Sequence, residues 1–440
     1  MTGPVLTPDD SGFADEVRGW LLNFESVPDV VVGAESPADV AAAVRFAVAE
    51  GLPVRIQGTG HGAEVRIDDG LLITTKRLDQ VEIDAAGRRA TIGAGVEWER
   101  VVEHAVAKGM APITGSSGTV GAVGFLLGGG LGPLIRSHGF GSDWVRDFEV
   151  VTAAGDLIHA NADEHADLFW ALRGGKGGLG VVTEVTVELA PLRTIYGGSL
   201  TFDEPHIEAA LRGWIDYIAT ADPRVSTSVA IMRLPDLPFI PEPVRGRTLL
   251  SLRFAYPGDA EAGGRLAGRL RAAAPVYIDA LGELSVGAMD SIHGDPTEPS
   301  PGWTRAQALN ALDQRFADIV LDHAGVGHDF PFVSLELRHL GSAASVDVPE
   351  GTAVGGRSAN ALLTLVGAPD PTVVETVISA AAEVVLAAID PWRGGETNVN
   401  FAGPREVRET PDAVWPAETL ARLATVRAQY DPDGTFVYGG

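Results

Sequence analysis

His61 stands in a glycine-rich stretch where little but main chain surrounds it. Residues 53–64 read PVRIQGTGHGAE, in which three glycines alternate with a threonine and the histidine. Glycines let the backbone approach a bound molecule closely, and a neutral imidazole is a nucleophile available near pH 7. The stretch is therefore a candidate for a loop that holds a ligand and reacts with it. The alternative is a loop histidine that only solvent satisfies.

Two further loops concentrate glycine, TGSSGTVGAVGFLLGGGLG at 114–132 and RGGKGGLG at 173–180. Main-chain N–H groups exposed by such loops form concave anion sites, which suit a pyrophosphate. The chain carries a formal charge of -26, so nucleic acid and anionic membranes are disfavoured as partners. The loops thus predict a phosphate-bearing cofactor.

The third loop contains a formal G-x-G-x-x-G at 175–180. A dinucleotide site of the Rossmann type needs a strand before this motif and a helix after it. Here the helix-like DLFWALR precedes the motif and a strand-like run follows it, so a nicotinamide enzyme is disfavoured.

With 440 residues the chain is expected to form two domains. It has no cysteine, which excludes disulfides, thiolate metal sites and cysteine nucleophiles. No secretion signal and no apolar run of about 20 residues is present, so a soluble, cytoplasmic protein is expected. The acidic run at 163–167 fits the first turn of a helix, and His323 and His328 lack a third ligand, so no metal is predicted.

Strand and helix signals mix in the first third, with a capped helix from Ser36 to Gly51 and an alternating strand at 181–189. From about residue 194 longer strands alternate with helices, including a helix over 371–389. This texture predicts one sheet with helices on one face, in a second domain.

The three loops, in this order and spacing, resemble the FAD-binding domain of the vanillyl-alcohol oxidase and p-cresol methylhydroxylase (PCMH) superfamily, specifically its berberine-bridge-enzyme-like branch. The resemblance is carried by GTGHG, SSGTVGAVGFLLGGGLGPLIRSHG, DLFWALRGGKGGLGVVT, NVNF and QYDPDGTF. It implies an α+β fold with two domains of the PCMH type. Residues 1–194 would form the FAD-binding domain, 195–395 a substrate-binding domain of antiparallel sheet covered by helices, and 396–440 a segment that returns to the FAD domain.

The resemblance implies FAD as the cofactor, bonded through His61 to the 8α-methyl of the flavin. The other residues expected to bind it are Gln57, Gly58, Thr59, Gly60, Gly62, Gly115, Ser116, Ser117, Gly118, Val120, Gly121, Gly124, Gly128, Gly180, Val182 and Asn400. Many family members attach the flavin a second time through a cysteine, where this chain has Ser117. A serine hydroxyl is too poor a nucleophile for that bond, so a single attachment is expected.

Val120 occupies the position of the family's oxygen gatekeeper, where a valine resembles the oxidases. A valine that only packs a loop is the alternative.

The family's Tyr-x-Asn near the C-terminus reads Asn398-Val399-Asn400 here, so its tyrosine is missing. On the expected strand both asparagines share one face, where Asn400 would donate to a flavin carbonyl and Asn398 would bind substrate.

A base must then come from elsewhere, and Glu336, Arg338 and His339 on the strand PFVSLELRHLG are candidates. Glu336 and Arg338 share one face of that strand and His339 lies on the other. A carboxylate near an apolar flavin face would have a raised pKa and accept a hydroxyl proton. A solvated Glu–Arg pair is the alternative.

The expected activity is oxidation of a small-molecule alcohol or amine, aromatic or sugar-type as in secondary metabolism, by hydride transfer to the flavin, with O2 reduced to H2O2. A dehydrogenase or monooxygenase-like enzyme, or a flavin-binding protein without turnover, stays open. A monomer or homodimer is expected.

Overall fold

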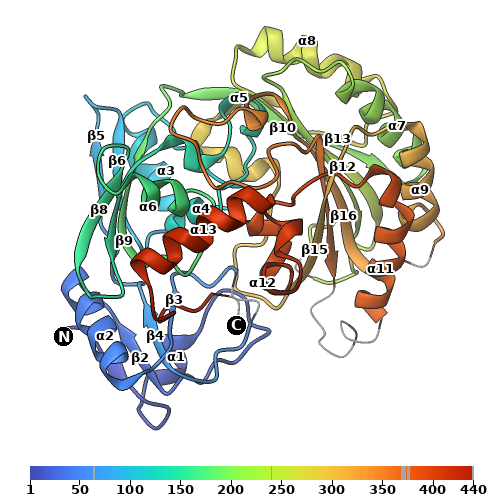
Figure 1. Ribbon diagram of the computed structural model, residues 1–440. Coiled ribbons are helices and arrows are strands. Elements are labelled where there is room, and N and C mark those ends of the chain that lie inside the picture. The colour runs from blue at the N-terminus through green and yellow to red at the C-terminus, as the bar shows by residue number, and fades with distance from the viewer. Residues whose placement is uncertain (63–64, 239, 329, 368–372, 374–376, 439–440) are drawn as a thin grey trace.

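Three sheets make up the fold of the computed structural model, which describes residues 1–62, 65–238, 240–328, 330–367, 373 and 377–438. Figure 1 shows two smaller sheets on the left and an eight-stranded sheet on the right. The described elements join helices with largely antiparallel strands, so the α+β class expected from the sequence is confirmed.

The first sheet is four-stranded, with the order β1 (Val5–Leu6), β2 (Val30–Gly33), β4 (Leu71–Thr74), β3 (Val54–Gln57), and α1 (Phe13–Val17) and α2 (Pro37–Glu50) accompany it. Helix α2 begins as the sequence predicts, because the Ser36 hydroxyl accepts a bond from the Asp39 amide at 3.2 Å and Pro37 follows. It ends at Gly51, whose φ of 69° is left-handed. Strand β3 leads directly into the His61 loop.

The second sheet is five-stranded, with the order β5 (Val81–Asp84), β6 (Arg89–Gly93), β9 (Val181–Glu188), β7 (Val145–Val151), β8 (Leu157–Asn161). Its helices are α3 (Trp98–Val106), α4 (Ala122–Leu127), α5 (Ile135–His138) and α6 (Ala166–Leu172). One apolar core joins both small sheets, from Val32 and Val44 to Val150 and Leu423. The loops between these elements carry all three glycine-rich segments, and α6 precedes the third of them as the sequence predicts.

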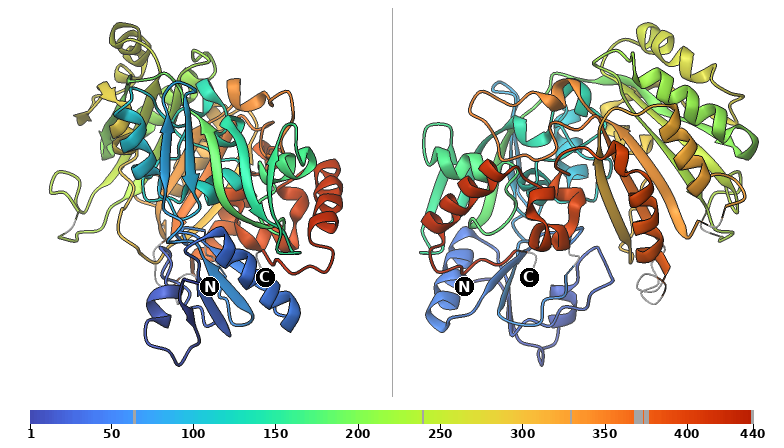
Figure 2. Two further views of the ribbon diagram at one scale, coloured as in Figure 1. Left: turned by 90° about the vertical axis from the view of Figure 1, so that its left-hand side faces the viewer. Right: turned by 45° about the vertical axis from the view of Figure 1, so that its right-hand side comes forward.

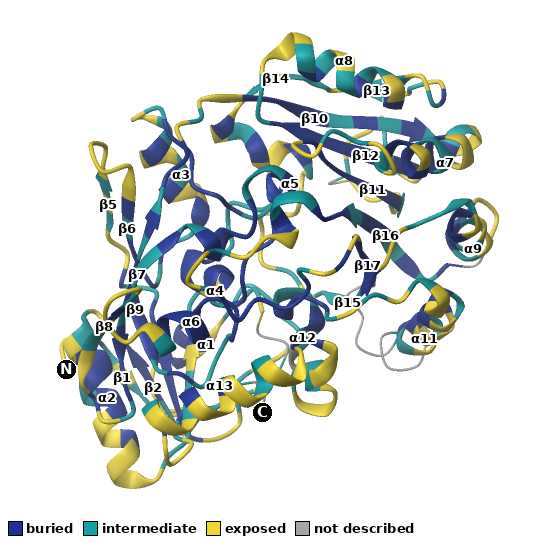
Figure 3. Cartoon of the chain, turned by 45° about the horizontal axis from the view of Figure 1, so that its top comes forward, coloured by how far each residue is buried: buried dark blue, intermediate teal, exposed yellow. Residues whose placement is uncertain are grey.

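The eight-stranded sheet runs β13 (Ile278–Asp279), β10 (Thr194–Asp203), β12 (Thr248–Tyr256), β11 (Ser226–Arg233), β16 (Phe332–His339), β17 (Ala361–Gly367), β15 (Trp303–Leu309), and β14 (Gly282–Ser285) pairs with β10. Four helices cover one face: α7 (Ile207–Ile218), α8 (Ala260–Arg271), α9 (Gln314–Ala324) and α11 (Ser379–Ala388). Leu252, Val229, Leu337 and Leu363 pack against them. Figure 3 shows these helices exposed on their outer sides, while the strands beneath are buried. The opposite face of the sheet is turned toward the two smaller sheets.

The C-terminal residues lie against the first two sheets after α12 (Val399–Glu409) and α13 (Ala417–Tyr430), as Figure 2 shows. The Val437 amide donates to the Val54 carbonyl at 2.9 Å, and the Trp415 indole donates to the Gly174 carbonyl at 3.1 Å. The final segment therefore buttresses the third glycine-rich loop.

Two expected elements differ from the structure. The expected strand at 398–401 is wrong, because Asn398 caps α12 instead, its side chain accepting from the Asn400 amide at 3.1 Å. The side-chain carbonyl of an asparagine readily accepts a hydrogen bond from a free amide in the first turn of a helix, so Asn398 becomes the N-cap of α12. The helix expected over 371–389 is described as α11 from Ser379, and 371, 372 and 374–376 lie outside the described residues.

Within the described residues, no helix is both long and apolar enough to cross a lipid bilayer.

Candidate active site

His61 lies where the first two glycine-rich loops meet. The Thr59 hydroxyl lies 3.3 Å from its Nδ1, and the Thr119 hydroxyl lies 3.2 Å from its Nε2. The Gly121 amide also donates to Thr59 Oγ1 at 3.2 Å. Two threonines therefore hold the imidazole from both ring nitrogens, which fixes its orientation.

The indole of Trp20 covers one side of the imidazole. The two rings are stacked, with centroids 4.3 Å apart and planes inclined by 21°. Burial lowers the pKa of His61 to about 4, because the protonated ring would lose its hydration there. His61 is therefore neutral near pH 7, the state in which a ring nitrogen is nucleophilic.

The two loops present main-chain N–H groups that no protein acceptor uses. Among the described residues, the amides of 59–62 and 116–119 donate to no protein acceptor. A Cβ added at Gly62 or Gly124 would meet open space. An unsatisfied run of amides beside bare backbone fits the diphosphate of a dinucleotide.

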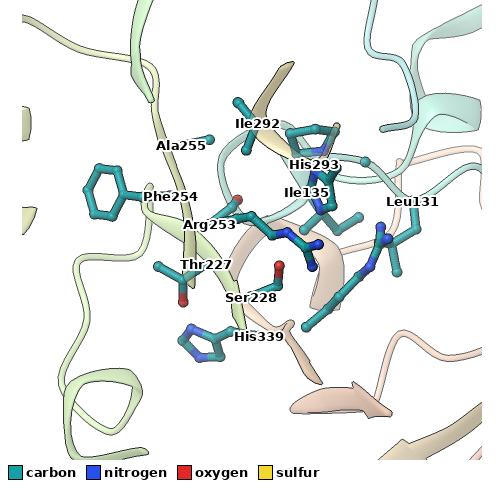
Figure 4. Close-up of a pocket in the computed structure, with 14 residues that line it drawn as sticks. Leu131, Ile135, Thr227, Ser228, Arg253, Phe254, Ala255, Ile292, His293 and His339 are labelled. Atoms are coloured by element: carbon teal, nitrogen blue, oxygen red, sulfur yellow. The ribbon is translucent and has the colours of Figure 1, made fainter. Parts of the chain in front are cut away.

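A hollow that is open to solvent, with about 320 Å³ of space including that solvent, lies between this half of the molecule and the eight-stranded sheet. Leu131, Gly132, Pro133 and Ile135 line it from the segment after the second glycine-rich loop. Ser228 of β11, Arg253 of β12 and Arg338 of β16 line it from the sheet, with His293 and His339. Figure 4 shows the Arg253 and Ser228 side chains pointing into this space. Both halves of the chain therefore build its walls.

Glu336 lies among positive side chains beside this hollow and is only 6% exposed. Arg253 Nη1 donates to its Oε1 at 2.8 Å, and Arg338 Nε donates to its Oε2 at 2.9 Å. His293 Nε2 lies 3.7 Å from Oε1. The cluster is a buried ion network, which rules out the solvated Glu–Arg pair.

His339 points away from Glu336, as the alternation of β16 predicts, and instead meets Arg136 of α5. Arg136 Nη1 lies 3.0 Å from His339 Nε2, and Arg136 also donates to the Leu340 carbonyl. Burial, with the Arg136 charge, lowers the pKa of His339 to about 3. His339 is therefore a neutral acceptor for the arginine.

Comparisons with known proteins agree with these features. The FAD binding domain family matches residues 28–161. (R)-6-hydroxynicotine oxidase of Paenarthrobacter nicotinovorans is 28% identical over 458 residues, covering 99% of this chain and 95% of the relative. The chain thus carries an FAD-binding domain and is an FAD-linked oxidoreductase that is similar over nearly its whole length to an FAD-dependent oxidase. FAD is its cofactor.

Two solved structures share the fold of this chain. Berberine-bridge-enzyme-like protein 1 of Physcomitrella patens has a TM-score of 0.86 at 18% identity, over 100% of this chain and 96% of that one. Glucooligosaccharide oxidase of Acremonium strictum, with a 6-S-cysteinyl, 8α-N1-histidyl FAD, has a TM-score of 0.82 at 21% identity, over 99% and 95%. The PCMH-type fold expected from the sequence is confirmed.

The predicted cofactor residues fall into three groups in this oxidoreductase. Thr59, Gly60 and Gly62 surround His61, and Ser116, Ser117, Gly118, Val120 and Gly121 belong to the loop that meets them. Gly115 and Gly128 are places of close packing, where an added Cβ would lie 3.0 Å from Phe125 and would clash with Asn400. At Gly58 an added Cβ would make ordinary contact with Ala94. Gln57, Gly180 and Val182 support the loops from behind: Gln57 donates to the Val17 carbonyl, and the other two pack against β7.

The two asparagines of NVNF do not share a strand face, because both belong to the start of α12. Asn398 is buried and donates to the Gly128 carbonyl at 2.9 Å, and it also lines a second, smaller hollow. Asn400 donates to the Phe125 carbonyl at 2.8 Å and accepts from Lys176 at 2.6 Å. Both therefore brace the segment 125–128 of the second glycine-rich loop.

The expected rise in the pKa of Glu336 is not what the structure gives. Burial raises the pKa, but the charges of Arg338 and Arg253 outweigh it and lower the pKa to about 2. The prediction did not include Arg253, because this residue lies on a different strand, β12. Glu336 is thus an ionised partner of two guanidiniums and a weak base.

The residues of this site that escaped the sequence prediction include Trp20, Thr119, Ser228, Arg253 and His293. Thr119 stands between two predicted loop residues, so its loop was a usable signal. Trp20 and His293 come from irregular segments far away in the chain, and no local pattern marks them. Arg253 lies within RTLLSLRFAY, where a lone arginine in an apolar strand was the one signal available.

Proposed function

We propose that this protein is an oxidase whose FAD is bonded through His61 alone and whose substrates are small-molecule alcohols or amines. The proposal rests mainly on His61. Its neutral imidazole is held by two threonines and lies beside loop amides that have no acceptor among the described residues. The relative that spans nearly the whole chain is an oxidase by name, which supports the choice of reaction. Because the chain has no cysteine, it cannot form the second, cysteinyl bond to the flavin that many family members have.

FAD, when bound, would supply a two-electron acceptor for the substrate that O2 could reoxidise with formation of H2O2. The chain contributes position and polarity. Arg338 and His339 line the larger hollow, Glu336 holds Arg338 and Arg253 in place, and Asn398 lines the smaller hollow. None of these is a strong base at pH 7, so we assign them to orienting the substrate.

Val120 supports the oxidase over a dehydrogenase, since a valine is small and its side chain is half-buried in the second loop. Its backbone carbonyl accepts from the Trp98 amide at 3.0 Å, so the loop's position is fixed independently of its side chain.

Acid precipitation tests the attachment. The wild-type pellet should be yellow and the peptide that contains His61 should carry the mass of FAD, whereas His61→Ala should give a colourless pellet. Stopped-flow reoxidation of the reduced protein in air then tests the oxidase. Sluggish reoxidation would favour a dehydrogenase, and a persistent oxygen adduct would favour a monooxygenase-like enzyme. If no alcohol or amine reduces the flavin, the protein would be a flavin-binding protein without turnover.

A further inference from the structure

Three polar side chains on adjacent strands face the larger hollow. In the antiparallel register Ser228 of β11 stands opposite Arg253 of β12 on one side and Arg338 of β16 on the other. Paired residues of neighbouring strands project from the same face of a sheet, so the three side chains form one row. The opposite face carries Val229, Leu252 and Leu337 under the helices. The row thus lies on the polar face of the sheet, opposite the apolar face that the helices cover.

The row has more hydrogen-bond donors than the protein uses. Within the described part of the chain, Arg253 Nε and the Ser228 hydroxyl are buried and without a partner. Arg253 and Ser228 are 6% and 4% exposed. In the described part of the chain, Arg338 donates one hydrogen bond, from its Nε to Glu336. In the same part of the chain neither ring nitrogen of His293 has a hydrogen-bond partner, although Nε2 lies 3.7 Å from Glu336 Oε1, and the neutral ring offers one donor. Buried donors without acceptors are costly, so an acceptor is expected in the hollow.

The charges beside the hollow do not balance either. Arg253 and Arg338 carry two positive charges, and Glu336 supplies one negative charge. His293 is neutral, because burial and then the two arginines lower its pKa well below the usual value. His339 is neutral too, and Arg136, which does not line the hollow, donates to the Val225 and Leu340 carbonyls. One positive charge therefore remains in a chain whose formal charge is -26.

We propose that this hollow is a subsite for a carboxylate group of the substrate, held by Arg338, Arg253 and Ser228. The inference rests on the proposed oxidase function and narrows it to alcohols or amines that carry a carboxylate. A carboxylate has one negative charge and two planar oxygens, which match one uncompensated charge and the fork of a guanidinium. A phosphate, with a charge near -2, matches the balance less well.

Binding of benzoate and of its uncharged isostere benzamide to the flavin-loaded protein tests the proposal. The readouts are perturbation of the flavin absorbance and the thermal midpoint, neither of which requires turnover. Benzoate should bind at least tenfold more tightly than benzamide and lose affinity as salt rises. Equal affinities, or no binding of benzoate at millimolar concentration, would overturn the proposal and leave the row as a water-filled polar cluster.

Variants locate the subsite. Arg338→Gln should weaken benzoate about ten- to a hundredfold, because a charge-assisted bond is lost. Ser228→Ala should weaken benzoate several-fold and keeps the ion network intact, so it stays informative if the first variant folds poorly. Arg315→Gln is the matched control, since that side chain is 80% exposed, and it should change nothing. Unchanged benzoate affinity in both Arg338→Gln and Ser228→Ala would contradict the assignment.

The proposal and the oxidase function on which it rests fail in different ways. If uncharged alcohols reduce the flavin as fast as their carboxylate analogues and benzoate does not compete, the subsite is refuted while the oxidase stands. If benzoate binds as expected but no alcohol or amine reduces the flavin, the oxidase is refuted while the anion site stands.

Discussion

The Trp20 indole lies flat on the His61 imidazole, with ring centroids 4.3 Å apart. Trp20 comes from a loop before β2 and His61 from the loop after β3, so the contact joins two segments of the first sheet. The Trp20 amide donates to the Thr59 carbonyl at 2.8 Å, which ties the two loops together. Stacking limits the ring to one orientation and excludes water from that side.

Removing this indole should slow flavin attachment. Stacked aromatic pairs contribute about 0.5–1.5 kcal/mol beyond burial, so Trp20→Ala should reduce the rate of acid-stable flavin incorporation roughly three- to tenfold. Trp20→Phe is the control and should stay near the wild type, because the indole N–H is buried without a partner in the described part of the chain. A Trp20→Ala protein that incorporates flavin at the wild-type rate would contradict this role.

Buried neutral histidines should make the protein sensitive to acid. The folded pKa of His61 is about 4 and that of His339 about 3, both below the unfolded value near 6.5. The unfolded chain therefore binds more protons between these values, and the free energy of unfolding falls as pH drops from about 6.5 toward 4.

His339→Gln isolates one of these protons. Glutamine keeps an acceptor for Arg136 but does not titrate, so the slope of the free energy of unfolding between pH 4 and 6 should flatten by up to about 1.4 kcal/mol per pH unit. Urea unfolding at a series of pH values measures it. An unchanged slope would mean that His339 is protonated in the folded protein.

Glu336→Gln should destabilise the protein rather than abolish a proton transfer. It removes the one carboxylate between two buried guanidiniums, and breaking a buried pair costs about 3–5 kcal/mol. Denaturant unfolding should show that loss. The pH profile of kcat/KM at neutral pH should keep its shape, since Glu336 with a pKa of about 2 does not titrate there. Loss of the acidic limb of that profile would instead make Glu336 the base.

Oxygen access should depend on the size of residue 120. Val120→Leu should slow reoxidation of the reduced flavin tenfold or more, because the larger side chain fills the space next to the cofactor loop. The rate at which substrate reduces the flavin should stay the same as in the wild type. Val120→Ala is the matched control and should reoxidise at least as fast as the wild type. Stopped-flow absorbance separates the two half-reactions. Equal reoxidation in all three proteins would leave Val120 as loop packing.

Much of the protein is readable from short stretches of sequence. Ser36 and Pro37 cap α2, His61 stands in a glycine-rich loop, and Glu336 and His339 lie on opposite faces of β16, because caps, loops and strand alternation depend only on neighbours in the chain. The absence of cysteine likewise excludes a cysteinyl bond to the flavin, whatever the fold.

Tertiary structure decided what surrounds those residues. Whether 398–401 formed a strand or capped a helix depended on the amide that Asn398 could reach, and the state of Glu336 depended on Arg253, 83 positions away. Trp20 reaches His61 only because β2 and β3 flank β4 in one sheet. The sequence determined which groups can react; their charge state and orientation arise from neighbours distant in the chain, since burial and Coulomb interactions act through space.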